Sequence, residues 1–204
     1  ATRAKVARVR RLQREARTGA VAVTQRTVRL KVIYNRMDAA LRQELAQPDS
    51  PRVSCTRGCD GCCRSRVYAT EVEAELIIQT VRQREGFAGV LALRERASVA
   101  LAATGCPGSP TYHAAVPCPL VKDGECSVYD VRPGLCRGFF VVSEPRLCHP
   151  PAVGEASAGP QRIVNFNLAT KILLRGLAPL TATGNIPSEL RDLNWQLVHS
   201  ITGD

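Results

Sequence analysis

Residues 54–63 read SCTRGCDGCC, and this stretch decides how the chain is organised. It holds four cysteines within nine residues, and the last two are adjacent. Such crowding fits disulfides, one metal ion, an iron–sulfur cluster or a reactive thiol. Gly58 and Gly61 allow the backbone to wrap around a small centre, because glycine adopts a positive φ at little cost.

The composition is that of a globular protein. The chain has 204 residues, of which 45% are hydrophobic and 4% aromatic. This length and composition predict one domain, with or without a helical extension, and a core built from Val, Leu, Ile and Ala. No apolar run reaches the roughly 18 residues of a membrane span, and no signal-peptide pattern is visible. We therefore expect a cytoplasmic protein.

The positive charge is concentrated at one end of the chain. The net charge is +10, and +8 of it lies in the first 50 residues. A basic arm of this kind can bind nucleic acid or an anionic partner. No aromatic residue stands among the arginines of the first 20 residues, as a stacking platform for bases would require. Nucleic acid is therefore not favoured as a partner.

The hydrophobic pattern predicts a mainly α fold in which helices surround a central, loop-built cysteine and metal centre, with little β structure. Thr70 and Glu73 form a capping box that begins one helix, and Gly86 lies just past its end. A brief strand is expected at 126–129 and a helical turn at 133–138. Ser188 is expected to cap the last helix. The expected helices cover residues 1–18, 21–46, 70–84, 89–104, 161–177 and the segment after Ser188.

We divide the chain into three parts by charge, cysteine content and expected helices. Residues 1–50 form a basic N-terminal helical arm. Residues 51–160 form the cysteine-cluster metal-binding domain. Residues 161–204 supply C-terminal helices that pack on the same domain.

The nine cysteines favour metal over disulfides. A chain without a signal peptide is expected to keep its thiols reduced, and there such a pattern more often binds metal. The spacing Cys55-x3-Cys59-x2-Cys62 offers three thiolates, which suit zinc or iron–sulfur clusters. One zinc needs only four ligands, and the chain has more. Three cysteines from one loop with a distant fourth are the usual holders of a cubane cluster.

The same spacing occurs in radical S-adenosylmethionine enzymes. Those enzymes use a partial β/α barrel, which this helical pattern does not predict. Their usual aromatic residue before the third cysteine is replaced here by Gly61.

A second cysteine region carries a more specific resemblance. It reads CPL at 118–120, DGECSVY at 123–129 and RPGLCR at 132–137. Together with the first run, these motifs resemble the YkgJ-type cysteine-cluster family, the CxxCxxCC proteins described as chelating zinc or iron. The resemblance covers residues 53–150, and Cys106 matches nothing in it. It implies a cofactor-binding, metal-ligating set of Cys55, Cys59, Cys62, Cys63, Cys118, Cys126, Cys136 and Cys148.

The function implied is metal binding. The preferred cofactor is an iron–sulfur cluster, in a redox or protein- or peptide-modifying enzyme or its partner. A related cysteine segment occurs in flagellin lysine N-methylases, which are longer. The alternative is a zinc-binding structural or interaction module whose basic helix binds a partner. The sequence identifies no catalytic residue and no oligomeric state.

A few other residues near the motifs have two interpretations each. Arg132 and Arg137 either compensate the charge of a thiolate centre or form buried pairs with Asp130 or with backbone carbonyls, and the second interpretation is preferred. Tyr129 is expected to be a core aromatic residue. His149, next to Cys148, is expected to be a loop histidine rather than a ligand. His113 and His199 are isolated and are given no chemistry.

Overall fold

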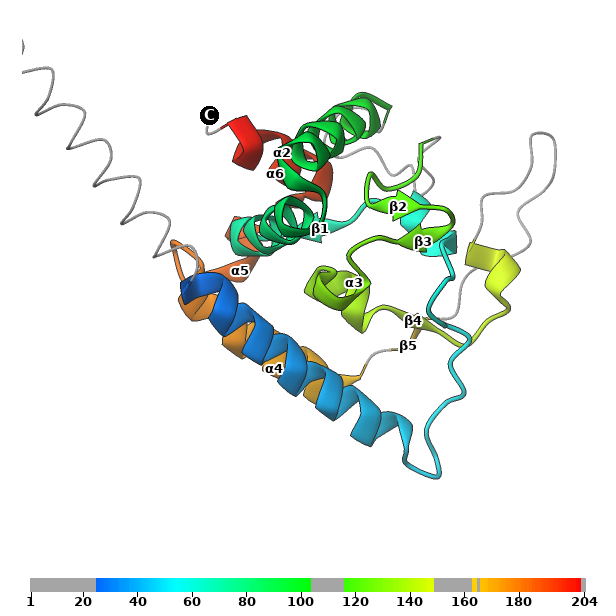
Figure 1. The fold of residues 1–204 in the computed structure, drawn as a ribbon. Helices are drawn as coiled ribbons and strands as arrows, with labels where there is room; N and C mark the ends of the chain where they lie inside the picture. Colours follow the sequence, from blue (N-terminus) through cyan, green and yellow to red (C-terminus); the bar gives the residue numbers. More distant parts are fainter. Residues whose placement is uncertain (1–24, 104–115, 149–162, 165, 203–204) are drawn as a thin grey trace, which may run out of the picture.

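The computed structural model describes residues 25–103, 116–148, 163–164 and 166–202, and over these residues the fold is mainly helical (Figure 1). A helix over residues 25–45, here called the N-terminal helix, comes first. The other elements are η1 (Gly61–Arg64), β1 (Tyr68–Ala69), α2 (Glu71–Ala103), β2 (Val121–Lys122), β3 (Glu125–Cys126), η2 (Tyr129–Val131), α3 (Gly134–Gly138), β4 (Phe140–Val141), η3 (Pro145–Cys148), β5 (Ile163–Val164), α4 (Asn167–Leu177), η4 (Ala178–Leu180), α5 (Ile186–Glu189), β6 (Arg191–Asp192) and α6 (Leu193–Thr202).

The described β structure consists of three antiparallel pairs of two-residue strands: β1 with β6, β2 with β3 and β4 with β5. The helices form a frame on two sides of the loops of residues 116–148, with α2 and α6 on one side and the N-terminal helix and α4 on the other (Figure 1). In Figure 1 the N-terminal helix runs beside α4, and α2 packs against α6. Among the described residues, no helix combines the length and the hydrophobicity that a membrane span requires.

The helices predicted for the middle of the chain are confirmed. α2 covers both predicted segments and bends at Gly86, whose φ of 69° and ψ of −166° interrupt the helix. This is the residue expected just past the end of the first segment, and its positive φ explains why glycine stands there. α3 follows Pro133 as expected. The predicted helix at 1–18 lies outside the described residues.

Three local predictions were wrong. The strand expected at 126–129 is instead β3, because Asp123 and Gly124 both have positive φ and make a tight hairpin turn whose return strand starts at Glu125. The helix expected at 161–177 begins only at Asn167, since β5 precedes it and pairs with β4.

The third error concerns the last helix. Ser188 lies inside α5 and does not cap α6. The free backbone N–H groups at the start of α6 are satisfied by Asp192 instead. Its Oδ1 accepts from Asn194 N at 2.8 Å and from Trp195 N at 3.3 Å. Asp is as good a capping residue as Ser.

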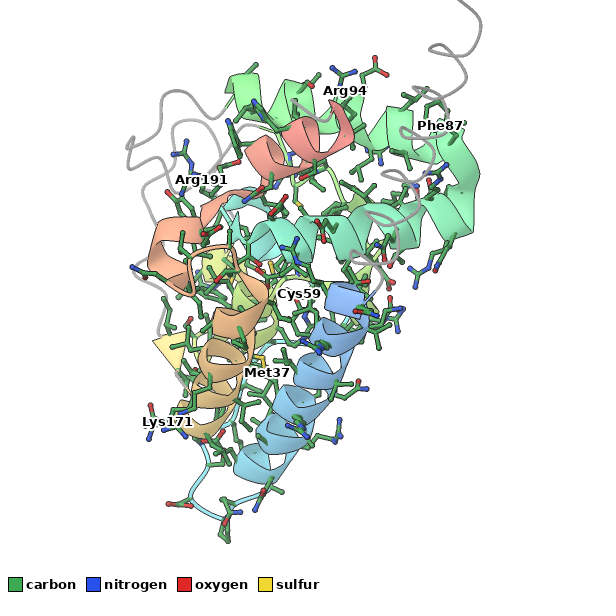
Figure 2. The ribbon with its side chains drawn as sticks, turned by 90° about the vertical axis from the view of Figure 1, so that its left-hand side faces the viewer. Met37, Cys59, Phe87, Arg94, Lys171 and Arg191 are labelled. Atoms are coloured by element: carbon green, nitrogen blue, oxygen red, sulfur yellow. The ribbon has the colours of Figure 1, made fainter. Side chains whose placement is uncertain are left out.

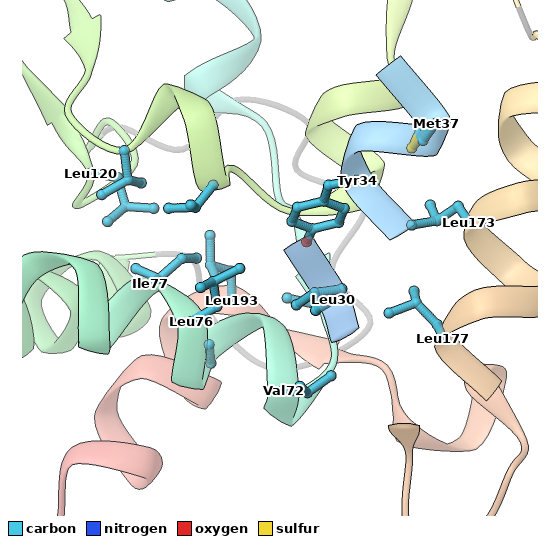
Figure 3. Packing of buried hydrophobic residues seen from close by; sticks show 14 of the residues in the cluster. Leu30, Tyr34, Met37, Val72, Leu76, Ile77, Leu120, Leu173, Leu177 and Leu193 are labelled. Atoms are coloured by element: carbon cyan, nitrogen blue, oxygen red, sulfur yellow. The ribbon is translucent and has the colours of Figure 1, made fainter. Parts of the chain in front are cut away.

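One hydrophobic core joins the helices (Figure 3). In that view Leu30 and Tyr34 of the N-terminal helix lie between α2, with Val72, and α4, with Leu177. Leu30 is fully buried, and Tyr34 is 2% exposed. Close packing depends on small residues: a Cβ on Gly176 of α4 would lie 2.7 Å from Cγ1 of Ile33.

A buried carboxylate ties three helices together. Glu73 is 3% exposed. Its Oε2 accepts the backbone N–H of Thr70 at 2.8 Å and the Thr70 hydroxyl at 2.9 Å, so half of the predicted capping box is confirmed. Its Oε1 accepts the hydroxyl of Tyr34 at 2.8 Å and the backbone N–H of Gly134 at 2.7 Å. Burial, with the Glu73 charge and hydrogen bond, raises the pKa of Tyr34.

We predict that Glu73→Gln lowers the free energy of unfolding by about 2–4 kcal/mol, because an amide cannot accept all four buried donors. Urea unfolding followed by far-UV circular dichroism measures this change. The matched control is Glu71→Gln in the same helical turn, where the side chain is 53% exposed. A change of about 0.5 kcal/mol or less is expected there. Equal effects of the two variants would contradict the central role of Glu73.

Candidate metal centre

Eight of the nine cysteines lie in the described residues, and all eight are free thiols. They stand on short, irregular segments. Figure 2 places Cys59 in the middle of the molecule, between α2 and the N-terminal helix in that view. The eight are Cys55 and Cys59 before η1, Cys62 and Cys63 in η1, Cys118 before β2, Cys126 in β3, Cys136 in α3 and Cys148 at the end of η3.

Backbone hydrogen bonds bring the two cysteine regions together. The N–H of Cys118 donates to the carbonyl of Cys63 at 2.7 Å. Ser54 N donates to the carbonyl of Val141 at 2.8 Å, and Val141 N donates in return to the sulfur of Cys55 at 3.3 Å. These hydrogen bonds fasten the first cysteine loop to the second cysteine region.

α2 holds the second region from one side. Arg84 donates to the carbonyl of Ser127 at 2.7 Å and to the carboxylate of Asp130 at 2.8 Å. Arg96 donates to the carbonyl of Pro119 at 2.9 Å. The hairpin carrying Cys126 is thus fixed by side chains that reach about 20 to 45 residues along the chain, which is a long-range effect of packing.

The thiols fall into two neighbouring groups by their electrostatic influence on one another. Burial raises the pKa of Cys148, and so do the charges of Cys55, Cys59 and Cys62. This agrees with the packing of η1 against η3. In the second group, Cys118 raises the pKa of Cys63 and of Cys136, and Cys126 raises that of Cys118 and of Cys136, but Cys62 of the first group also acts on all four.

The adjacent pair Cys62 and Cys63 joins the two groups. The hydrogen bond from the Cys63 thiol lowers the pKa of Cys62 to about 7, and it raises the pKa of Cys63. Burial raises the pKa of Cys118 to about 12 and also raises that of Cys136. Cys62 therefore ionises more readily than Cys63, Cys118 and Cys136, whose pKa values are raised.

The donor set fits a thiophilic metal in its chemistry, since all eight groups are sulfur. The side chains are not arranged as a metal site: among the residues that the structure describes, no three His, Cys, Asp or Glu side chains lie close enough to hold one ion. The loops would have to draw together around a bound metal. Gly58, with φ of 88°, makes one bend in the first cysteine loop.

The two arginines of the RPGLCR motif have different surroundings. Arg137 is 3% exposed and donates to Asp38 at 2.6 Å and to the carbonyl of Asp130 at 2.6 Å. The structural interpretation therefore holds for Arg137, with Asp38 as its carboxylate partner. Arg132 lies over the ring of Tyr129, with its Cζ 3.7 Å from the centroid. Tyr129 is half-buried and serves as a platform for this guanidinium rather than as a core residue.

The structure also contains a surface cavity that the sequence did not indicate. A surface cavity of about 600 Å³ lies between α2, the segment around Arg191 and α6, and no cysteine lines it. Trp195 and His199 stack there with ring centroids 4.0 Å apart. His199 thus has an aromatic neighbour, away from the thiols. His113, His149 and Cys106 lie outside the described residues.

The comparison with known families bears on the cysteine region. Residues 54–152 match the family model described as "CxxCxxCC: Putative zinc- or iron-chelating domain". All eight predicted ligands fall inside the match. It confirms the resemblance to a metal-chelating cysteine cluster and leaves the choice of zinc or iron open. No curated protein and no solved structure matches the chain.

We predict that Cys62 is the first cysteine to be alkylated in metal-free protein, because reaction requires the thiolate. Its labelling rate should rise with pH and reach half its maximum at the pKa of about 7. Iodoacetamide labelling across pH, read by tandem mass spectrometry, separates Cys62 from Cys63. Cys63→Ala removes the thiol donor and should move the profile to higher pH. Faster labelling of Cys118 would contradict the assignment.

Proposed function

Because residues 54–152 match a zinc- or iron-chelating domain, we propose that this chain holds an iron–sulfur cluster on Cys55, Cys59, Cys62 and Cys148. The observation that carries the proposal is the position of Cys148. Three cysteines of one loop plus a distant fourth make up a cubane ligand set. The charges of Cys55, Cys59 and Cys62 act on the thiol of Cys148 across about 90 residues of sequence.

The remaining thiols supply a second four-sulfur set next to the first, consisting of Cys63, Cys118, Cys126 and Cys136. The backbone hydrogen bond from Cys118 to Cys63 and the influence of Cys118 on Cys63 and Cys136 support this division. Adjacent residues of a short helical turn point in different directions. Cys62 and Cys63 can therefore each serve one set.

An iron–sulfur cluster supplies one-electron transfer when it is bound. The chain's own residues bind and shield it. α2 and the N-terminal helix contribute to the core on which the thiol-bearing loops pack. The function we propose is a redox protein, or an enzyme or enzyme partner that modifies a protein or peptide.

The zinc alternative also has an observation in its favour. The described cysteine segments contain only two-residue strands and short helical turns. A structural metal would stabilise such segments, since binding free energy becomes folding free energy. Zinc in both sets would make the domain a structural or interaction module.

We predict that anaerobically purified protein is brown, is bleached by dithionite and contains about four iron and four sulfide per cluster. Iron, zinc and acid-labile sulfide analysis measures this. Cys148→Ser should lose the iron and the sulfide, whereas Cys126→Ser in the second set should keep them. A colourless protein that contains only zinc would overturn the iron–sulfur proposal in favour of the structural module.

A further inference from the structure

The N-terminal helix lies at the edge of the molecule, and its two long sides differ (Figure 1). Its inward side carries buried residues of the core, among them Leu30, Tyr34 and Met37. Its outward side carries Val28 and Val32, which are 56% and 47% exposed. The helix therefore leaves apolar surface in water on the side that the core does not use.

The two exposed valines begin a row of residues at coiled-coil spacing. Val28, Val32, Asn35 and Ala39 follow one another at intervals of four, three and four residues, and all of them are exposed. Residues at this spacing lie along one line of a helix, which is how a helix presents a seam to a second helix. Apart from Asn35, the row consists of small or β-branched apolar side chains that a second helix can cover.

Basic residues flank this row on both sides. With about 3.6 residues per turn, Arg29 and Arg36 lie along one side of the row, and Lys31 and Arg42 lie along the other. All four side chains are exposed. None of the four forms a salt bridge with another described residue.

The acidic residues of the same helix are engaged by other segments. Asp38 accepts a hydrogen bond at 2.6 Å from Arg137, which is buried. Glu44 accepts the backbone N–H groups of Leu168 and Ala169 at the start of α4, both at 3.2 Å. The helix over residues 25–45 contains no third acid. Its outward side therefore carries positive charge that no acid of the same helix offsets.

We propose that the outward side of the N-terminal helix, meaning the row from Val28 to Ala39 and its four basic neighbours, binds an acidic amphipathic helix of a partner protein. The apolar side chains of that helix cover the row, and its carboxylates pair with the basic flanks. The inference needs no metal on the cysteines, so it goes beyond the proposed function and stands apart from it.

The chemistry of this side favours a protein helix over other anionic partners. A second copy of this chain would bring two basic sides together, and like charges that face each other oppose binding. The phosphates of a nucleic acid would pair with the basic residues but would leave the exposed valines in water. A membrane-surface helix needs large apolar anchors such as Trp, Phe or Leu, and the row offers only valine and alanine.

The probe is a fluorescent acidic peptide as long as this helix, with Leu at its a and d positions and Glu at its e and g positions. A matched peptide carries Lys in place of Glu. Fluorescence anisotropy measures the binding of each peptide to the full chain. We expect the acidic peptide to bind and the lysine peptide not to bind, and the affinity for the acidic peptide should fall as salt is added.

Two double variants test the two parts of the surface. Val28→Ser with Val32→Ser should weaken binding of the acidic peptide by about tenfold, because it removes the apolar seam. Arg29→Glu with Arg36→Glu should also weaken it by about tenfold and should strengthen binding of the lysine peptide. The matched control is Arg82→Glu with Arg94→Glu, which changes the net charge equally on exposed positions of α2. It should bind the acidic peptide within about twofold of the wild type, because its charges lie outside the contact.

Equal weakening by the two arginine pairs would mean that net charge alone attracts the peptide, and it would contradict the inference. Unchanged binding in the valine variant would contradict it as well. The same holds if duplex DNA, or vesicles of phosphatidylserine and phosphatidylcholine, bind more tightly than the peptide and lose that binding in Arg29→Glu with Arg36→Glu. Circular dichroism checks the fold, and the valine variant decides if the arginine variant does not fold.

Iron and zinc analysis of the same samples keeps the two proposals distinguishable. Wild-type protein without metal that binds the acidic peptide would remove the proposed function and support this inference. Wild-type protein that holds metal and does not bind the peptide would remove this inference alone.

Discussion

The carboxylate of Glu73 is the interaction on which the arrangement of the helices depends. It accepts two hydrogen bonds from Thr70, one from the hydroxyl of Tyr34 and one from the backbone of Gly134. Those donors belong to the start of α2, to the N-terminal helix and to the start of α3. A buried carboxylate is tolerated only when it is fully hydrogen-bonded, so the three segments must meet at one point. α3 carries Cys136, and the position of that thiol follows from the same contact.

A glycine at the start of α3 allows the close packing between α3 and α4 that accompanies the Glu73 contact. A Cβ on Gly134 would lie 2.5 Å from the methyl groups of Leu173 in α4, so only glycine lets α3 approach that helix while its N–H reaches Glu73. Arg137, one turn further along α3, then meets Asp38 of the N-terminal helix. The RPGLCR motif therefore serves two purposes: it supplies a thiol, and its glycine and second arginine fasten that thiol to the frame.

The features that the sequence predicted are those that depend on neighbouring residues. The Glu73 half of the capping box at Thr70, the break at Gly86 and the helical turn after Pro133 arise from local backbone chemistry, and all three are present. The family motifs marked the cysteine region, which the family match confirms. Three features were not predictable, because each depends on which distant segments become neighbours. They are the pairing of β4 with β5, the cap that Asp192 provides for α6, and the hydrogen bonds that Oε1 of Glu73 accepts. The same holds for the arginines: the motif does not distinguish them, and only the tertiary structure pairs Arg137 with Asp38 and stacks Arg132 on Tyr129.

The contrast between the frame and the cysteine loops suggests how stability is divided in this protein. The helices supply most residues of one apolar core and satisfy their own backbone groups, so burial of apolar surface stabilises them. The loops have almost no ladder hydrogen bonds, and they place several thiols where burial raises their pKa values. A protonated thiol at a buried position makes only weak interactions, whereas a metal-bound thiolate forms a strong bond that also compensates its charge. In the cysteine loops, metal–thiolate bonds would therefore provide the stabilisation that backbone hydrogen bonds provide in helices and sheets. The helical frame fixes the positions of the loops between which those bonds form.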